Sequence, residues 1–127
     1  MENLFIKATK YTPEINLDVN THIMSIIGKS YPENTFEYYK PIITWIEEYL
    51  LYVEHETATF NLDLEYLNSS SLKAYFDLFD ILEMAQESGK KIAINWIYDA
   101  DNDIAEETGE DFIADFTIYT LCIFLIY

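Results

Sequence analysis

Residues 57–98 read TATFNLDLEYLNSSSLKAYFDLFDILEMAQESGKKIAINWIY, which contains a complete strand, helix and strand pattern. From 57 to 67 apolar and polar residues alternate, as is typical of a strand. From about 70 to 88 apolar residues recur every three or four positions, which predicts a helix, and Gly89 is placed to end it. Residues 92–98 are apolar at nearly every position and predict a strand buried on both faces. This order indicates a parallel βαβ unit.

The flanking residues extend the pattern in both directions. Short apolar runs at 4–6 and 22–27, separated by turn-forming residues, indicate antiparallel strands. Asn34 can cap a helix whose apolar residues recur at spacings of three and four. A short helix at 103–110 and a last strand within 116–127 complete the order. We therefore predict an α/β fold with a mixed sheet, N-terminal antiparallel strands and three helices.

Length and composition indicate a single domain over residues 1–127. The chain has a mass of 15.0 kDa and is 50% hydrophobic by residue type, which suits one ordinary core and leaves little room for a second. The three glycines, Gly28, Gly89 and Gly109, stand far apart, so no glycine-rich nucleotide-binding loop is possible. No cofactor is expected.

The charge excludes several classes of partner. Seven basic and 23 acidic residues give a net charge of −16 with histidine neutral. Such a surface repels phosphate backbones and anionic lipid headgroups, so we expect binding neither to nucleic acid nor to membranes.

Cysteine use and the apolar runs indicate a cytoplasmic protein. Cys122 is the single cysteine, so no internal disulfide can form, and its apolar neighbours indicate a core thiol. No signal-peptide pattern opens the chain, and the longest apolar run, 121–127, is too short to span a bilayer.

The motifs of common enzymes are missing. His22 and His55 lie in unrelated segments, with no zinc-binding pattern and no nucleophile elbow around a serine. We read both histidines as structural and predict no catalytic residues and no enzymatic activity.

One acidic stretch supplies an alternative. Asp99, Asp101 and Asp103 stand at alternate positions with Glu110 further on, which is similar to the ligand spacing of a calcium-binding EF-hand loop. Ile104, however, occupies the position at which that loop needs glycine. The alternative function is a calcium-binding protein or a small metal-dependent enzyme using this loop, and the simpler reading is a strand-to-helix turn with a capping residue.

The segment 64–73 places three hydroxyls, Ser69, Ser70 and Ser71, where a strand ends and a helix begins. A helix start favours negative charge, so a phosphate added there would be tolerated, and Lys73 could partly neutralise it. From residue types alone, simple capping by the serines is the favoured explanation of the segment.

Four stretches carry a resemblance to a known family: SYPENT at 30–35, YLNSSSLK at 66–73, FDLFDILE at 76–83 and WIYD at 96–99. In order and spacing they closely resemble the SiaC family of bacterial regulatory phosphoproteins. Members of that family are similar to STAS-type anti-sigma-factor antagonists. They are small α/β domains that a dedicated kinase phosphorylates on a hydroxyl at a helix start and that a phosphatase restores.

The resemblance implies a partner switch that is not itself an enzyme. The hydroxyl after the YLN stretch is the acceptor in the family, which carries over to Ser69, with Ser70 as second choice because threonine is usual there and serines are adjacent here. Unmodified members are implied to bind and activate a diguanylate cyclase, which connects the switch to cyclic di-GMP and biofilm behaviour.

Partner contacts are expected around this acceptor. The carboxyl ends of the parallel strands, at Leu67 and Tyr98, should lie on one edge of the sheet. The residues expected to contact the kinase, the phosphatase or the cyclase are Tyr66, Asn68, Ser70, Ser71, Lys73 and Tyr98. Strand packing, helix capping and core filling remain alternative roles for Tyr66, Asn68 and Tyr98 respectively. A third possible function is a structural subunit that pairs with another copy through 121–127.

Overall fold

The computed structural model describes residues 1–118 and 120–125, and it describes residues 121–125 by their backbone alone. The elements follow in the order β1 (Leu4–Ile6), β2 (Glu14–Asp18), β3 (Ile23–Ser30), α1 (Thr35–Tyr52), β4 (Ala58–Leu67), α2 (Ser69–Glu87), β5 (Ile92–Tyr98), α3 (Asp103–Asp115) and β6 (Thr120–Leu125). The predicted succession of strands and helices is confirmed. The side chain of Cys122 and residues 126–127 lie outside the described part, so the core thiol stays a prediction.

The six strands form one sheet in chain order, β1-β2-β3-β4-β5-β6. β1 pairs with β2 and β2 with β3 in antiparallel fashion, whereas β3 to β6 run parallel. The predicted α/β class, with a mixed sheet and antiparallel strands at its N-terminal side, is confirmed. Because the winding never reverses direction, this sheet has no switch point of the kind at which many α/β proteins bind ligands.

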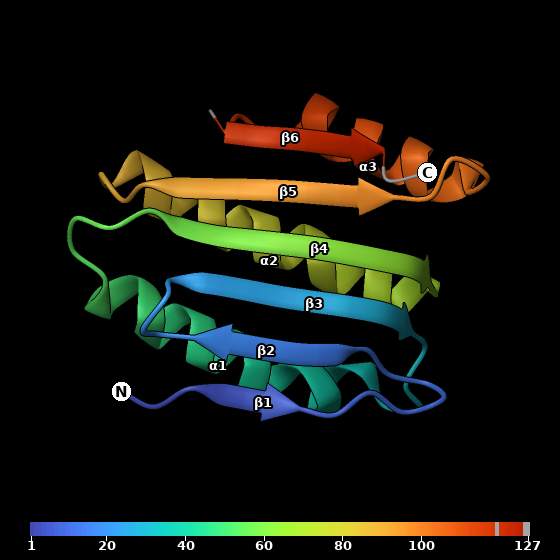
Figure 1. Ribbon diagram of the computed structural model, residues 1–127, viewed down its shortest axis with the longest axis horizontal. Helices are drawn as coiled ribbons and strands as arrows, with labels where there is room; N and C mark the ends of the chain where they lie inside the picture. The colour runs from blue at the N-terminus through green and yellow to red at the C-terminus, as the bar shows by residue number, and fades with distance from the viewer. Residues whose placement is uncertain (119, 126–127) are drawn as a thin grey trace.

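All three helices lie on the same face of the sheet, behind the strands in Figure 1. Right-handed crossovers that all progress in one direction produce this arrangement. The expectation that the strand at 92–98 is buried on both faces is therefore wrong. Its open-face residues, Ala93, Asn95 and Ile97, are only partly buried. Apolar composition cannot distinguish a strand buried on both faces from one buried on a single face. Asn95 does mark the open face, since its amide donates to Asn61 at 2.7 Å.

The core between the sheet and the helices explains why α3 is longer than predicted. The sequence predicts a helix at 103–110, but α3 continues to Asp115. Phe112 lies in the added turn, is fully buried and stacks on Phe79 with ring centroids 4.0 Å apart. The indole of Trp96 also donates to the Ala105 carbonyl at 2.8 Å. Burial against other elements extends the helix, which local sequence does not reveal.

Each helix begins with an asparagine cap. The side-chain oxygen of Asn34 accepts from the Glu37 amide, that of Asn68 from the Ser71 amide and that of Asn102 from the Ala105 amide. At the other end of α2, Gly89 has a φ of +106°, the left-handed conformation predicted for it.

We expect Phe112→Ala to lower the free energy of unfolding by about 3–5 kcal/mol, because it removes a fully buried ring and leaves a cavity. Phe36→Ala is the matched control. Its ring is 73% exposed, so the change should stay within about 0.5 kcal/mol. Urea denaturation followed by circular dichroism measures both, and equal losses would contradict the assignment of Phe112 to the core.

Candidate functional site

The carboxyl ends of the parallel strands meet at one edge of the sheet, and the helices begin there. β3 ends at Ser30, β4 at Leu67 and β5 at Tyr98, and their arrowheads point the same way in Figure 1. The predicted placement of Leu67 and Tyr98 on one edge is confirmed. The starts of α1 and α2 consequently lie side by side at the end of the molecule that carries the serine segment.

Asn68, rather than a serine, caps α2. Its side-chain oxygen accepts the Ser71 amide at 2.9 Å, and its own amide donates to the Ser30 carbonyl at 3.1 Å. The capping role considered for Asn68 is thus its observed role. Because the cap is supplied by asparagine, the serine hydroxyls are not needed for it.

The three serines have different surroundings. Ser69 is exposed, and its hydroxyl bonds to no residue in the described part of the chain. The Ser70 hydroxyl is exposed too, but it lies 2.7 Å from the Thr35 hydroxyl and donates to Asn68 at 3.3 Å. Ser71 is fully buried. The expectation that Ser71 contacts a partner is not supported, because its side chain does not reach the surface.

A chain of buried hydroxyls surrounds Ser71. Its Oγ lies 2.8 Å from Ser30 Oγ, which lies 2.5 Å from the Tyr39 hydroxyl. The Tyr39 hydroxyl in turn donates to the Tyr75 hydroxyl at 3.1 Å. Each hydroxyl has one proton, so Ser30 must donate to Tyr39 and Ser71 to Ser30. This chain connects the start of α2 to β3 and α1.

Burial keeps Tyr39 and Tyr75, the two tyrosines among these connected hydroxyls, protonated. It raises the pKa of Tyr39, and it raises the pKa of Tyr75 well above the ordinary value, with a further contribution from nearby Tyr39. The hydroxyls therefore remain donors throughout the physiological pH range.

A β-bulge interrupts the pairing of β3 with β4 just before the serines. In the pairing of β3 with β4, Gly28 lies opposite Leu64 and Lys29 opposite Tyr66, so Glu65 has no partner. Gly28 has a φ of +128°, which only glycine adopts readily. Tyr66 is half exposed rather than packed within the sheet, and its ring meets that of Tyr31 edge to face at 5.7 Å.

Lys73 does not contact the serines. Its ammonium group lies 3.1 Å from the Asp77 carboxylate, one turn further along α2, and both side chains are largely exposed. A phosphate at the start of α2 would compete with Asp77 for this lysine.

Tyr98 lies on the predicted edge but is tied to α3. Its hydroxyl donates to Glu106 at 2.8 Å, and this bond to a carboxylate is the main reason that its pKa is raised. It shares no hydrogen bond with the serine segment among the described residues.

The acidic loop forms the start of α3. Asp99 accepts the Asp101 amide at 2.9 Å, and Asn102 caps α3. Within residues 1–118 and 120–125, no three histidine, cysteine, aspartate or glutamate side chains come together in a group that could hold a metal ion. The alternative calcium or metal-dependent function therefore lacks the geometry that it requires.

The histidines remain apart as well. His22 lies 2.7 Å from the Tyr49 hydroxyl through its Nδ1, near the far end of α1, and His55 is exposed beside Glu54.

None of the three helices in the described part has the length and apolar character needed to cross a lipid bilayer.

Several residues of the site were not foreseen from sequence. Thr35, Ser30 and Tyr39 reach the serines from elements far away in the chain, which no local pattern signals. The burial of Ser71 did have a signal, since it precedes Tyr75 by four residues and therefore lies on the apolar face of α2.

The fold and this edge together define a small α/β domain with an exposed serine at a capped helix start, whose hydroxyl has no hydrogen bond to the residues that the structure describes. Comparison with known families gives the class a name. The family model described as SiaC family regulatory phosphoprotein matches residues 6–125. The chain belongs to this family.

Individual relatives agree with that assignment. An uncharacterized protein of Pseudomonas aeruginosa (strain UCBPP-PA14) is 37% identical over 115 residues, which cover 91% of this chain and 90% of the relative. The structure of SiaC of P. aeruginosa is similar with a TM-score of 0.91 at 34% identity, covering 99% of this chain and 100% of that one. SiaC in a crystal structure of the diguanylate cyclase SiaD with its activator SiaC, also from P. aeruginosa, gives 0.88 at 34% identity, covering 97% and 99%.

We expect Ser30→Ala to lower the free energy of unfolding by about 1–3 kcal/mol, because it removes the acceptor of the buried Ser71 hydroxyl and leaves the Tyr39 hydroxyl with its bond to Tyr75 alone. Ser71→Ala removes one bond and should cost about 1 kcal/mol. The exposed Ser69→Ala, measured by the same urea titration, should stay within about 0.5 kcal/mol. A larger loss for Ser69→Ala than for Ser30→Ala would contradict the site geometry.

The free energy of unfolding should fall as the pH rises through about 10, the ordinary tyrosine pKa. The raised pKa values of Tyr39 and Tyr75 mean that their contribution is complete below this pH and is lost above it, because the unfolded chain loses its protons first. Tyr75→Phe should show a shallower fall in denaturation series between about pH 9 and 11. An identical fall in both proteins would disprove this role.

Proposed function

We propose that the protein is a cytoplasmic partner switch without catalytic activity of its own. In the unmodified state it binds and activates a diguanylate cyclase. A dedicated kinase transfers a phosphate to Ser69, which ends the interaction, and a serine/threonine phosphatase restores it. Family membership supports the regulatory logic, and the crystal structure of SiaD with SiaC supports a cyclase as the partner.

The observation that carries the assignment of Ser69 is its accessibility. Its hydroxyl is exposed and has no bond to break among the described residues, whereas Ser70 is bonded to Thr35 and Ser71 is buried. In the transfer, Ser69 Oγ forms a bond to the γ-phosphorus of ATP, the bond to the leaving ADP breaks, and the hydroxyl proton passes to a base of the kinase.

The scaffold is suited to retain its fold when this phosphate is added. The first turn of a helix has amide groups without intrahelical acceptors, and Asn68 occupies only that of Ser71. The helix dipole also favours negative charge there. The effect of the modification therefore falls on the surface, where it adds about 1.5 to 2 negative charges.

The expected magnitude is sufficient for a switch. If the unmodified protein binds with a dissociation constant near 1 μM, binding is worth roughly −8 kcal/mol. Desolvating a phosphate against an apolar or acidic surface could remove about 3 kcal/mol of this, or roughly a hundredfold in affinity.

The acceptor is tested by incubating the protein with ATP and the kinase of its own organism, followed by intact mass and peptide mapping. We expect one phosphate, located on Ser69 and abolished by Ser69→Ala. Ser71→Ala should still be phosphorylated because that hydroxyl is buried. A phosphate on Ser70 in the wild-type protein, or one that persists in Ser69→Ala, would refute the assignment.

The partner is tested by titrating each diguanylate cyclase of the same organism with the protein and measuring both binding and cyclic di-GMP formation from GTP. We expect one cyclase to be bound and stimulated. After phosphorylation of the protein, its affinity for that cyclase should fall about a hundredfold, and the stimulation should fall with it. The protein alone should form no cyclic di-GMP. Equal binding of modified and unmodified protein, or no stimulation of any cyclase, would refute the proposed function.

A further inference from the structure

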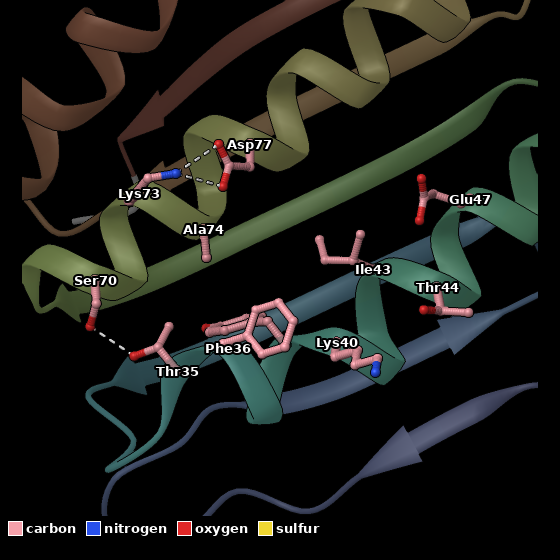
Figure 2. A pocket seen from close by; sticks show the side chains of 11 residues that line it. Thr35, Phe36, Lys40, Ile43, Thr44, Glu47, Ser70, Lys73, Ala74 and Asp77 are labelled. Carbon is pink, nitrogen blue, oxygen red and sulfur yellow. Dashed lines mark hydrogen bonds and ion pairs between the residues drawn. The ribbon is translucent and has the colours of Figure 1, made fainter.

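The hydrogen bond between Thr35 and Ser70 joins the starts of two helices that are far apart in the chain. Thr35 is the first residue of α1, Ser70 belongs to the first turn of α2, and their hydroxyl oxygens lie 2.7 Å apart. Figure 2 shows this bond at one end of a groove of about 500 Å³ between the two helices. A residue outside the serine segment therefore acts directly on one of the serine hydroxyls.

The protons of these two hydroxyls have definite directions. Ser70 Oγ donates to the side-chain oxygen of Asn68 at 3.3 Å, because an amide oxygen can only accept. Each hydroxyl has one proton, so Thr35 must be the donor in its bond to Ser70. The Ser70 hydroxyl thus has its proton directed at Asn68 and a lone pair occupied by the proton of Thr35. The two bonds together fix the rotation of the Ser70 side chain.

Exposure alone does not distinguish Ser70 from Ser69, since both residues are exposed. A serine hydroxyl that accepts a phosphate must turn a lone pair to the γ-phosphorus of ATP and its proton to a base of the kinase. Ser69 can do so without breaking a hydrogen bond to any residue in the described part of the chain. Ser70 must first leave both Thr35 and Asn68, and the bond to Thr35 is the shorter of the two.

We propose that Thr35 determines which serine is phosphorylated, because its hydroxyl holds Ser70 and thereby confines the phosphate to Ser69. The inference rests on the proposed function and adds to it the residue that selects the acceptor. Thr35 is a positioning residue, since it acts through Ser70 and not on ATP. The choice between two adjacent serines then depends on how α1 packs beside α2, and not on the serine segment alone.

The same contacts disfavour the phosphorylated state of Ser70. Transfer to this residue would form a bond from its Oγ to the γ-phosphorus, break the bond to the leaving ADP and pass the hydroxyl proton to the base of the kinase. The Ser70 oxygen would then have no proton to donate, so the Asn68 oxygen would face an anion that can only accept. A phosphate on Ser69 leaves the bonds among Thr35, Ser70 and Asn68 as they are.

The first test removes the Thr35 hydroxyl while nearly preserving the shape of the side chain. Thr35→Val is incubated with ATP and the kinase that phosphorylates the wild type, and peptide fragmentation measures how the phosphate is divided between Ser69 and Ser70. The share on Ser70 should rise by about threefold to tenfold, the factor that one neutral hydrogen bond corresponds to. Thr35→Ser keeps the donor and should restore the wild-type distribution.

The change is clearest when Ser69 is removed. Ser69→Ala should carry no phosphate, whereas Thr35→Val combined with Ser69→Ala should carry one on Ser70. Thr44→Val is the matched control, because Thr44 is an exposed threonine further along α1 that lines the same groove, and it should leave the distribution unchanged.

The substitutions at Thr35 should leave the fold intact. The cap of α1 is the side chain of Asn34, which accepts the Glu37 amide and does not use the Thr35 hydroxyl. Melting followed by circular dichroism checks each variant. Thr35→Ala removes the same donor, so it should shift the distribution in the same direction and provides a second measurement should Thr35→Val melt early.

A further comparison shows whether Thr35 acts through Ser70. Ser70→Ala removes the hydroxyl that Thr35 holds, so adding Thr35→Val to it should leave the rate of Ser69 phosphorylation unchanged. A slower rate in this double variant than in Ser70→Ala would mean that the kinase contacts Thr35 directly, and it would overturn the proposal.

The outcomes separate this inference from the proposed function. If the wild type is phosphorylated on Ser69 and the Thr35 variants place no additional phosphate on Ser70, with or without Ser69, the inference is overturned and the proposed function stands. If no kinase of the organism phosphorylates the wild type, the proposed function falls and the inference falls with it.

Discussion

The start of α2 is held in place by one set of interactions, and the functional surface depends on it. Asn68 caps the helix, and the hydroxyls of Ser71, Ser30, Tyr39 and Tyr75 form a buried chain that connects α2 to β3 and α1. A fully bonded buried network of this kind allows little variation in how the first turn is oriented. With Ser71 turned inward and Ser70 bonded to Thr35, Ser69 is the hydroxyl that remains available at the surface.

The topology brings the starts of the helices together at one end of the molecule. Parallel strands that follow one another in chain order place every helix on one face, and each helix starts at the same edge of the sheet. Neighbouring helices then run parallel, and their positive dipole ends coincide. The same arrangement creates the groove between α1 and α2, which begins beside Thr35 and Ser70.

The sequence predicts most of the fold because its local patterns are clear. Strict alternation at 57–67, helical spacing after residue 70 and Gly89 correspond to β4, α2 and the left-handed end of that helix. The position of the site could be predicted from the sequence, but the separate roles of its residues could not. The contacts of Ser30 and Thr35 with the serines join residues 41 and 35 positions apart, and such contacts exist only once the helices have packed. The face of β5 that carries Ala93 is left open by the topology, and α3 is extended because Phe112 packs into the core. Residue types alone specify neither.

The central claim is that a phosphate on Ser69 changes the surface while the scaffold stays as it is. The most direct measurement is amide hydrogen exchange and backbone NMR on the stoichiometrically phosphorylated protein and on the unmodified one. The account predicts that chemical-shift changes are confined to the first turns of α1 and α2 and the groove between them, and that protection in β3, β4 and the rest of α2 is unchanged. Loss of protection along the whole of α2, or in the strands beneath it, would contradict the account.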